Sequence, residues 1–302
     1  MSGVAAAADP TGVTRPLTPD ATPIKVRAPK PIRFGAEPSK PTRFVILIIT
    51  GVLFLLPVVA MVEFSLRVGQ PVNGVQAYGP LHYLAIFDPA SSSTYQVLFQ
   101  AIGNSLIICL ITVVIILVLL LPTMLLVELR FPKLRRVLEF ICIIPITIPT
   151  IVLVVGFVPV YSTVVSIFGS APWTLAFAVG VIVLPYAYRP IAANMAAFDL
   201  ITLSEAGRSL GAGWGNVIWR IILPNLRRGI FASAFITIAV VLGEYTIASF
   251  LSRNVFQTAL VLLQHTDPYV AVIFAVIALV FAFALLLIIG RLGSVGRNRK
   301  TA

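Results

Sequence analysis

The chain has 302 residues, 59% of them apolar, and a mean hydropathy of +1.01. Only 11% of the residues are charged, against about 25% in an ordinary soluble domain, which argues against a soluble globular enzyme and, for most of the chain, against disorder. The chain has 22 basic and 11 acidic residues. In a membrane protein such an excess of Lys and Arg reflects the orientation of the chain across the bilayer rather than nucleic-acid binding. The composition therefore predicts an all-α membrane protein, because helices satisfy their own backbone hydrogen bonds in lipid.

The first 43 residues differ in composition from the rest of the chain. They hold eight of the 22 prolines and a scatter of Lys and Arg. Since no helical or strand period runs through them, we predict a disordered, basic, Pro-rich cytoplasmic tail over residues 1–43. A signal peptide is not expected, because the first apolar run begins near Phe44 and is too long for one.

Six long apolar runs follow this tail, and each is near the roughly 20 residues that a helix needs to cross the hydrocarbon core. They cover residues 44–66, 101–127, 138–160, 173–191, 230–252 and 268–290. Prolines make the third and fourth runs the least regular. We expect six transmembrane helices in one membrane domain over residues 44–290, followed by a basic cytoplasmic tail over 291–302.

The positions of Lys and Arg predict which side of the membrane each loop occupies. With the N-terminus inside, twenty of the 22 basic residues are cytoplasmic, and only Arg67 and Arg253 lie outside. The sequence therefore predicts a multi-pass protein of the cell membrane with both termini in the cytoplasm.

One cytoplasmic segment, between the fourth and fifth spans, is long enough to have a structure of its own. Thr202 and Glu205 have the spacing of a capping box, which predicts a helix start at Thr202. Gly211 is a typical residue at a helix C-terminus. A second amphipathic stretch runs from Trp214 to Pro224, where we expect the proline to break it.

This segment resembles the signature of the binding-protein-dependent ABC importer permeases, which is Glu-Ala-Ala, then a glycine, then Ile-x-Leu-Pro. The positions that match are Glu205, Ala206, Gly207, Gly211, Ile221, Leu223 and Pro224. Gly207 replaces the usual second alanine and leaves room for close packing. The resemblance covers roughly residues 80–290. Within the family the proline-rich third span and Gly243-Glu244-Tyr245 are most similar to the polyamine, opine and phosphonate branch.

The resemblance implies a function and a set of partners. Residues 202–224 would be the coupling segment that docks on an ATPase subunit. The expected partners are two ATPase subunits, a second permease subunit (a heterodimer being favoured over a homodimer), an extracytoplasmic solute-binding protein and membrane lipid, with no nucleic acid. The solute would be polyamine-like or related, or else a sugar, phosphonate or other small solute.

No covalent chemistry is expected of this chain. Its closest approach to a nucleotide-binding loop, residues 293–301, has the wrong spacing and follows a span. ATP and Mg²⁺ would therefore be bound by the partner ATPase subunits, with no cofactor, catalytic residue or metal site here. His82 and His265 have too few neighbouring ligand residues for a metal site.

Two acidic residues lie in or near spans, where a charge is costly. Glu63 is expected to reach the interface at the outer end of the first span. Glu244, beside Tyr245 in the fifth span, either lines the translocation path or anchors a neighbouring helix; a path role would suit a cationic solute.

Two other classes of protein compete with an importer permease. An ion-gradient-driven secondary transporter would show an inverted repeat and paired ionisable residues at mid-membrane, and a membrane enzyme would need clustered Asp, His or Arg at the interface. The sequence shows none of these patterns, and the long cytoplasmic segment has no role in either class.

The predicted orientation is testable by cysteine labelling. With Ser92→Cys we expect reaction with an impermeant maleimide in intact cells, whereas Ser209→Cys should react only after permeabilisation. The parent chain is the control for its two native thiols. Labelling of position 209 in intact cells would contradict the arrangement with both termini inside.

Overall fold

The computed structural model describes residues 39–72, 75–88 and 92–294. The chain divides into two units, Met1–Gly51 and Val52–Ala302. In the first, the described part is the beginning of helix α1. Most of the predicted tail over residues 1–43, and residues 295–302 of the C-terminal tail, lie outside the described residues, although α1 already begins at Lys40.

The described residues are almost entirely helical, with one two-stranded antiparallel hairpin. The α-helices are α1 Lys40–Ser65, α2 Leu81–Phe87, α3 Ser92–Arg130, α4 Arg135–Thr147, α5 Thr150–Phe168, α6 Leu175–Ala196, α7 Leu200–Ser209, α8 Trp214–Asn216, α9 Leu223–Leu242, α10 Thr246–Phe250, α11 Phe256–Thr266 and α12 Pro268–Ser294. The hairpin pairs β1 (Arg67–Val72) with β2 (Val75–Tyr78), and three short helices complete the set: η1 Pro132–Leu134, η2 Pro172–Thr174 and the π-helix η3 Val217–Ile222.

Six helices in the described part of the chain are long and apolar enough to cross a membrane. They are Pro41–Ser65, Tyr95–Arg130, Thr150–Phe168, Pro172–Ala196, Trp214–Leu242 and Pro268–Ile288. The predicted class, an all-α membrane protein with six candidate spans, is confirmed.

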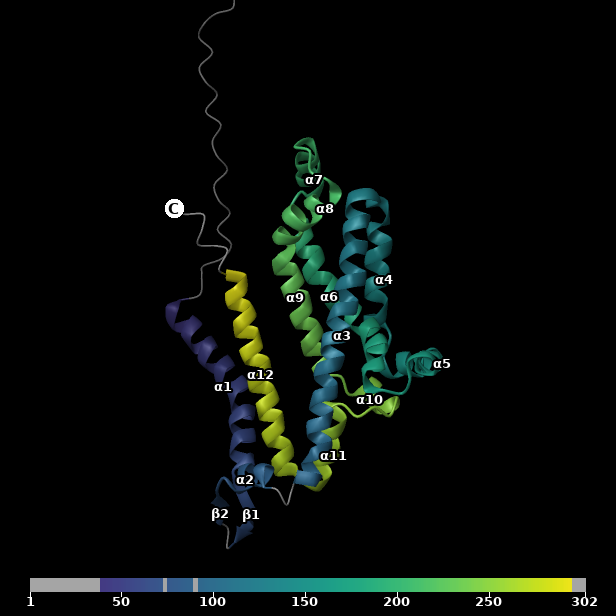
Figure 1. Ribbon diagram of the computed structural model, residues 1–302. Helices are drawn as coiled ribbons and strands as arrows, with labels where there is room; N and C mark the ends of the chain where they lie inside the picture. The colour runs from purple at the N-terminus through teal and green to yellow at the C-terminus, as the bar shows by residue number, and fades with distance from the viewer. Residues whose placement is uncertain (1–38, 73–74, 89–91, 295–302) are drawn as a thin grey trace, which may run out of the picture. The chain divides into compact units, whose positions relative to one another are not determined.

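The predicted third span, residues 138–160, is wrong as one continuous helix. α4 ends at Thr147 and α5 begins at Thr150, because Ile148 is extended (φ −99°, ψ 128°). Ile148 precedes Pro149, and the ring of a proline disfavours the helical conformation of the residue before it. In Figure 1, α5 is seen end-on while α4 is seen along its length, so the chain changes direction at this break.

The predicted fifth span, residues 230–252, also differs from the structure. α9 ends at Leu242, and a short irregular link through Gly243 and Glu244 leads to the separate helix α10. At its other end α9 begins earlier than expected, because it continues from the coupling segment without interruption.

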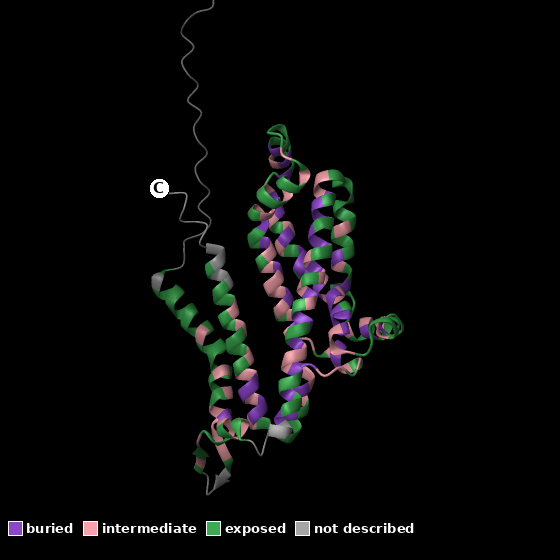
Figure 2. Ribbon diagram, viewed as in Figure 1, coloured by how far each residue is buried: buried purple, intermediate pink, exposed green. Residues whose placement is uncertain are grey.

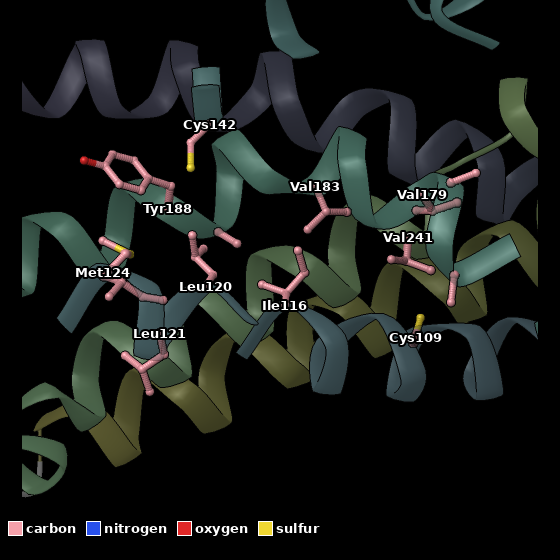
Figure 3. Packing of buried hydrophobic residues seen from close by; sticks show 14 of the residues in the cluster. Cys109, Ile116, Leu120, Leu121, Met124, Cys142, Val179, Val183, Tyr188 and Val241 are labelled. Atoms are coloured by element: carbon pink, nitrogen blue, oxygen red, sulfur yellow. The ribbon is translucent and has the colours of Figure 1, made fainter. Parts of the chain in front are cut away.

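Helix α6 is the centre of the packing. In the most apolar stretch of this span 56% of the residues are buried, whereas none are buried in the corresponding stretch of α1. Its buried face consists mostly of small and β-branched residues, and it packs against α3, α4 and α9. Figure 2 shows the buried residues concentrated on α3 and α6, and an exposed α5. Figure 3 shows Val179 and Val183 of α6 facing the cluster of Ile116, Leu120 and Val241.

A glycine allows α6 and α9 to approach closely at one crossing. A Cβ atom at Gly229 would lie 2.9 Å from the carbonyl oxygen of Pro190 and 2.7 Å from Cβ of Asn194. With its amide nitrogen facing α9, Asn194 donates to the carbonyls of Asn225 and Leu226, each at 3.2 Å. This contact between small side chains and a polar group, typical of membrane helix pairs, holds the N-terminal half of α9 against α6.

Candidate functional site

Helix α7 forms the first arm of the predicted coupling segment. It begins at Leu200 and is capped by Asp199, whose Oδ1 accepts from the backbone N–H of Thr202 at 3.1 Å. The hydroxyl of Thr202 donates to Asp199 Oδ2 at 2.6 Å. The expected capping box with Thr202 as the cap is therefore wrong, because Thr202 lies inside the helix and an aspartate three residues earlier is the stronger acceptor. These hydrogen bonds, first that of the Thr202 side chain, hold the pKa of the Asp199 carboxyl below its usual range.

The predicted end of this helix at Gly211 is confirmed. Gly211 has φ +85°, a conformation that glycine adopts without the steric cost of a Cβ atom. Its N–H bonds to the carbonyl of Arg208 at 2.9 Å, and the N–H of Ala212 bonds to that of Gly207 at 3.1 Å. This pair of bonds is a Schellman motif, which satisfies the last carbonyls of α7 and turns the chain sharply.

The second arm does not end at Pro224, which is a further correction. α8, η3 and α9 form one helix over Trp214–Leu242, and Pro224 occupies its interior. The proline has no N–H to give to the preceding turn, and the helix accommodates it with a wider π-turn in which the N–H of Leu223 bonds to the carbonyl of Ile218. The side chain of Asn225 donates to the carbonyl of Ile221 at 2.8 Å.

The two arms touch at Gly207. A Cβ atom there would lie 2.6 Å from Cδ1 of Ile221 and 3.3 Å from Cγ2 of Val217. Gly207 is buried, so α7 lies directly on the π-turn. The structure thus brings together Gly207 of the first arm and Ile221 of the second. This close contact gives a packing reason for glycine at position 207.

The opposite face of α7 is open. Glu205 and Ala206 are exposed, and Leu210 is 90% exposed at the tip. Of the other matched positions, Ile221 and Leu223 are half-buried and Pro224 is exposed. The motif therefore divides into two sets. Gly207 and Ile221 hold the two arms together, whereas Glu205 and Ala206 face away from the rest of the chain.

Trp214 joins both arms to the end of α3, a contact that sequence reasoning missed. The guanidinium of Arg208 lies 4.8 Å from the centre of the indole ring, and that of Arg130 lies 5.4 Å from it. Such cation–π contacts contribute about 0.5–1 kcal/mol each at exposed sites. The sequence showed an aromatic residue and several arginines, but only the fold determines which arginines meet it.

The side chain of Glu244 has a local partner. Its Oε1 accepts from the N–H of Ile247 at 2.7 Å, so the half-buried carboxylate caps the start of α10. The neighbouring Tyr245 is 42% exposed. The carboxylate of Glu244 thus fixes the start of α10, a helix that follows it directly in the chain.

Glu63 belongs to a separate polar cluster at the end of α1. It forms an ion pair with Arg67 at 2.9 Å and accepts from the hydroxyl of Tyr78 at 2.8 Å. Because these partners lie on the strands that follow α1, the cluster fastens the β-hairpin to the helix end and explains the acidic residue structurally.

Comparison with known proteins bears on the same region. The model of the family "Binding-protein-dependent transport system inner membrane component" matches residues 125–293, more than half of the chain and all of residues 202–224. The chain belongs to this family. Its description makes the chain an inner membrane component of a binding-protein-dependent transport system.

One curated relative of this transport component is Sulfate permease 2, chloroplastic, of Chlamydomonas reinhardtii. The two are 32% identical over 81 residues, which is 27% of this chain. The match spans only 22% of the length of that relative.

The Trp214 contacts predict a difference between two tryptophans of the segment. Trp214→Leu should raise the rate of limited trypsin cleavage in α7 about five- to thirty-fold, because losing about 1–2 kcal/mol of cation–π attraction favours local opening. Trp219→Leu is the control, since Trp219 is 72% exposed. Equal cleavage rates in the two variants would show that Arg130 and Arg208 do not hold the segment.

Proposed function

We propose that the chain is the transmembrane permease subunit of an ATP-driven importer, and that the outer face of α7 docks on an ATPase subunit. The observation that carries this proposal is the combination of an exposed α7 face with a rigid attachment. The attachment consists of the Asp199 cap, the Schellman turn, the contact at Gly207 and the Trp214 contacts. A helix lying loosely on the surface would lack the last two, which join α7 to other elements.

The direct connection from α7 to a span supports a coupling role. α7 rests on the π-turn, and the π-turn continues into α9 within one helix. Movement of a protein bound to Glu205, Ala206 and Leu210 would therefore be transmitted to α9 rather than absorbed by a flexible loop. Residues 202–224 are accordingly the proposed coupling segment, with Gly207, Gly211, Ile221, Leu223 and Pro224 maintaining its shape.

The proposed assembly follows from the family. It contains two ATPase subunits that bind ATP and Mg²⁺, a second permease subunit, and an extracytoplasmic binding protein that delivers the solute. A heterodimer of permeases is favoured over a homodimer by the resemblance to the polyamine, opine and phosphonate branch. Both termini, including the tail over residues 1–43, are placed in the cytoplasm by the distribution of Lys and Arg.

The solute is proposed only as a small molecule. Polyamine-like, opine-like and phosphonate-like solutes follow from the resemblance, sugars remain an alternative, and the name of the sulfate permease adds an inorganic oxyanion. An ion-gradient-driven transporter is the alternative of a different class. This class is less well supported, because such a transporter has no ATPase subunit on which the rigid coupling segment could dock.

Reversal of the charge at Glu205 tests the docking proposal. Because Glu205 is exposed, Glu205→Lys should leave membrane insertion unchanged while lowering solute uptake, and co-purification of the ATPase subunit, at least tenfold. Glu139→Lys, the same change at an exposed position of α4, should have little effect. Normal uptake by Glu205→Lys at parental expression would overturn the assignment of α7.

The two roles considered for Glu244 predict different results for Glu244→Gln. Glutamine can still accept the hydrogen bond from Ile247, so a capping role predicts near-parental uptake and assembly. A path role for a cationic solute predicts reduced uptake with assembly unchanged, since the negative charge is lost. The capping geometry leads us to expect near-parental uptake, measured at saturating binding protein. A severalfold loss would restore Glu244 and Tyr245 to the translocation path.

A further inference from the structure

A hollow of about 280 Å³ lies between α10 and α11. Most of its polar lining consists of hydroxyl groups, together with one arginine and one histidine. These residues are Tyr245, Ser249, Ser252, Arg253, Thr258 and His265. The remaining lining residues are apolar, and none of the lining residues is an aspartate or glutamate.

Arg253 is positively charged. Among the described residues ion pairs join Arg67 to Glu63 and Arg135 to Glu128, and neither pair includes Arg253. Its Nε donates to the hydroxyl of Tyr161 at 3.0 Å, and its Nη1 donates to the backbone carbonyl of Ser170. Both acceptors are uncharged, and a guanidinium has five N–H donors in all. The half-buried Arg253, which lines the hollow, therefore keeps its charge and has N–H donors that these two bonds do not use.

The guanidinium is held in place by Tyr161 and Ser170, neither of which lines the hollow. Its carbon lies 5.4 Å from the centre of the Tyr161 ring, and the hydroxyl of Tyr161 also bonds to that of the buried Thr174 at 2.9 Å. The backbone carbonyl of Arg253 accepts from the hydroxyl of Thr258 at 3.0 Å. These contacts fix the arginine before any ligand arrives, and such preorganisation reduces the entropy lost on binding.

The backbone beside Arg253 adds an independent observation. Ser252 has φ +53° and is the described non-glycine residue with a positive φ. This conformation closes α10 through bonds from Ser252 N to Ser249 O at 3.1 Å and from Arg253 N to Ala248 O at 2.8 Å. Glycine would adopt it without strain. The serine instead adds a residue with a hydroxyl group to the lining of the hollow.

The hollow is far from the coupling segment. α9 has 20 residues, which corresponds to about 30 Å at 1.5 Å per residue, and α10 follows its far end (Figure 1). In the proposed orientation this is the extracytoplasmic side, where the solute arrives.

We infer that this hollow binds an oxyanion, meaning a carboxylate, phosphonate or sulfate group, through the guanidinium of Arg253 and the hydroxyls of Tyr245, Ser249 and Ser252. A planar guanidinium matches the paired oxygens of such groups, and hydrogen bonds between charged partners are about twice as strong as neutral ones. The assignment to an imported solute rests on the proposed function. An anionic lipid headgroup has the same chemistry and is the other source of the group.

The test measures binding to the full-length chain, purified with the subunits that co-purify, in nanodiscs of neutral lipid. Sulfate, methylphosphonate and acetate are titrated by calorimetry, with putrescine as a cationic comparison. We expect saturable binding of at least one oxyanion and none of putrescine. Repeating the titration in nanodiscs with anionic lipid separates the sources, since competition by this lipid identifies a headgroup site and unchanged affinity identifies a solute site.

Two variants separate binding from a purely structural role of Arg253. Arg253→Gln should weaken oxyanion binding at least tenfold, and Arg253→Lys should retain part of it. Tyr161→Phe removes a structural partner of Arg253 but keeps the charge and the ring, so binding should persist. Absence of oxyanion binding by the parent, or equal binding by Arg253→Gln and the parent, would overturn the inference. The ATPase co-purification assay is unaffected by either result, so failure of this site and failure of the proposed function can be told apart.

Discussion

Hydrogen bonding of the backbone in the absence of water is the constraint on which this structure depends. A proline in an apolar run lacks a backbone donor that lipid cannot replace, and the chain responds differently at two of them. At Pro149 the helix stops and a new one begins in another direction. At Pro224 the helix continues through a π-turn, and the side chain of Asn225 bonds to a carbonyl of that turn. The course of the chain follows from these local solutions as much as from hydrophobicity.

The features that depend on composition or short-range spacing could be predicted from the sequence. The number of candidate spans agrees with the six apolar runs because the thickness of the bilayer fixes the length of a span, although the bounds of the third and fifth differ. Gly211 ends α7 as expected, because a positive φ favours glycine. The small residue at Gly207 was expected to permit close packing, and Ile221 lies against it.

Other features depend on competition between neighbours that a single sequence does not decide. Asp199 rather than Thr202 caps α7, since both are acceptable caps and the aspartate lies at the actual helix start. Pro145 is accommodated within α4, whereas Pro149, four residues later, coincides with a break. The contacts of Trp214 with Arg130 and Arg208 join residues from separate elements, so no local pattern could have predicted them.

The unbroken helix from Trp214 to Leu242 has a mechanical consequence. Its 29 residues correspond to a rod of about 43 Å. A tilt of about 5° around the middle of such a rod displaces each end by about 2 Å, in opposite directions. One end carries the contact with α7, and the other leads through Gly243 to α10 and the hollow beside Arg253. A small rotation at the end that carries α7 is therefore sufficient to change the spacing of groups at the far end by most of a hydrogen-bond length, with no helix having to unfold.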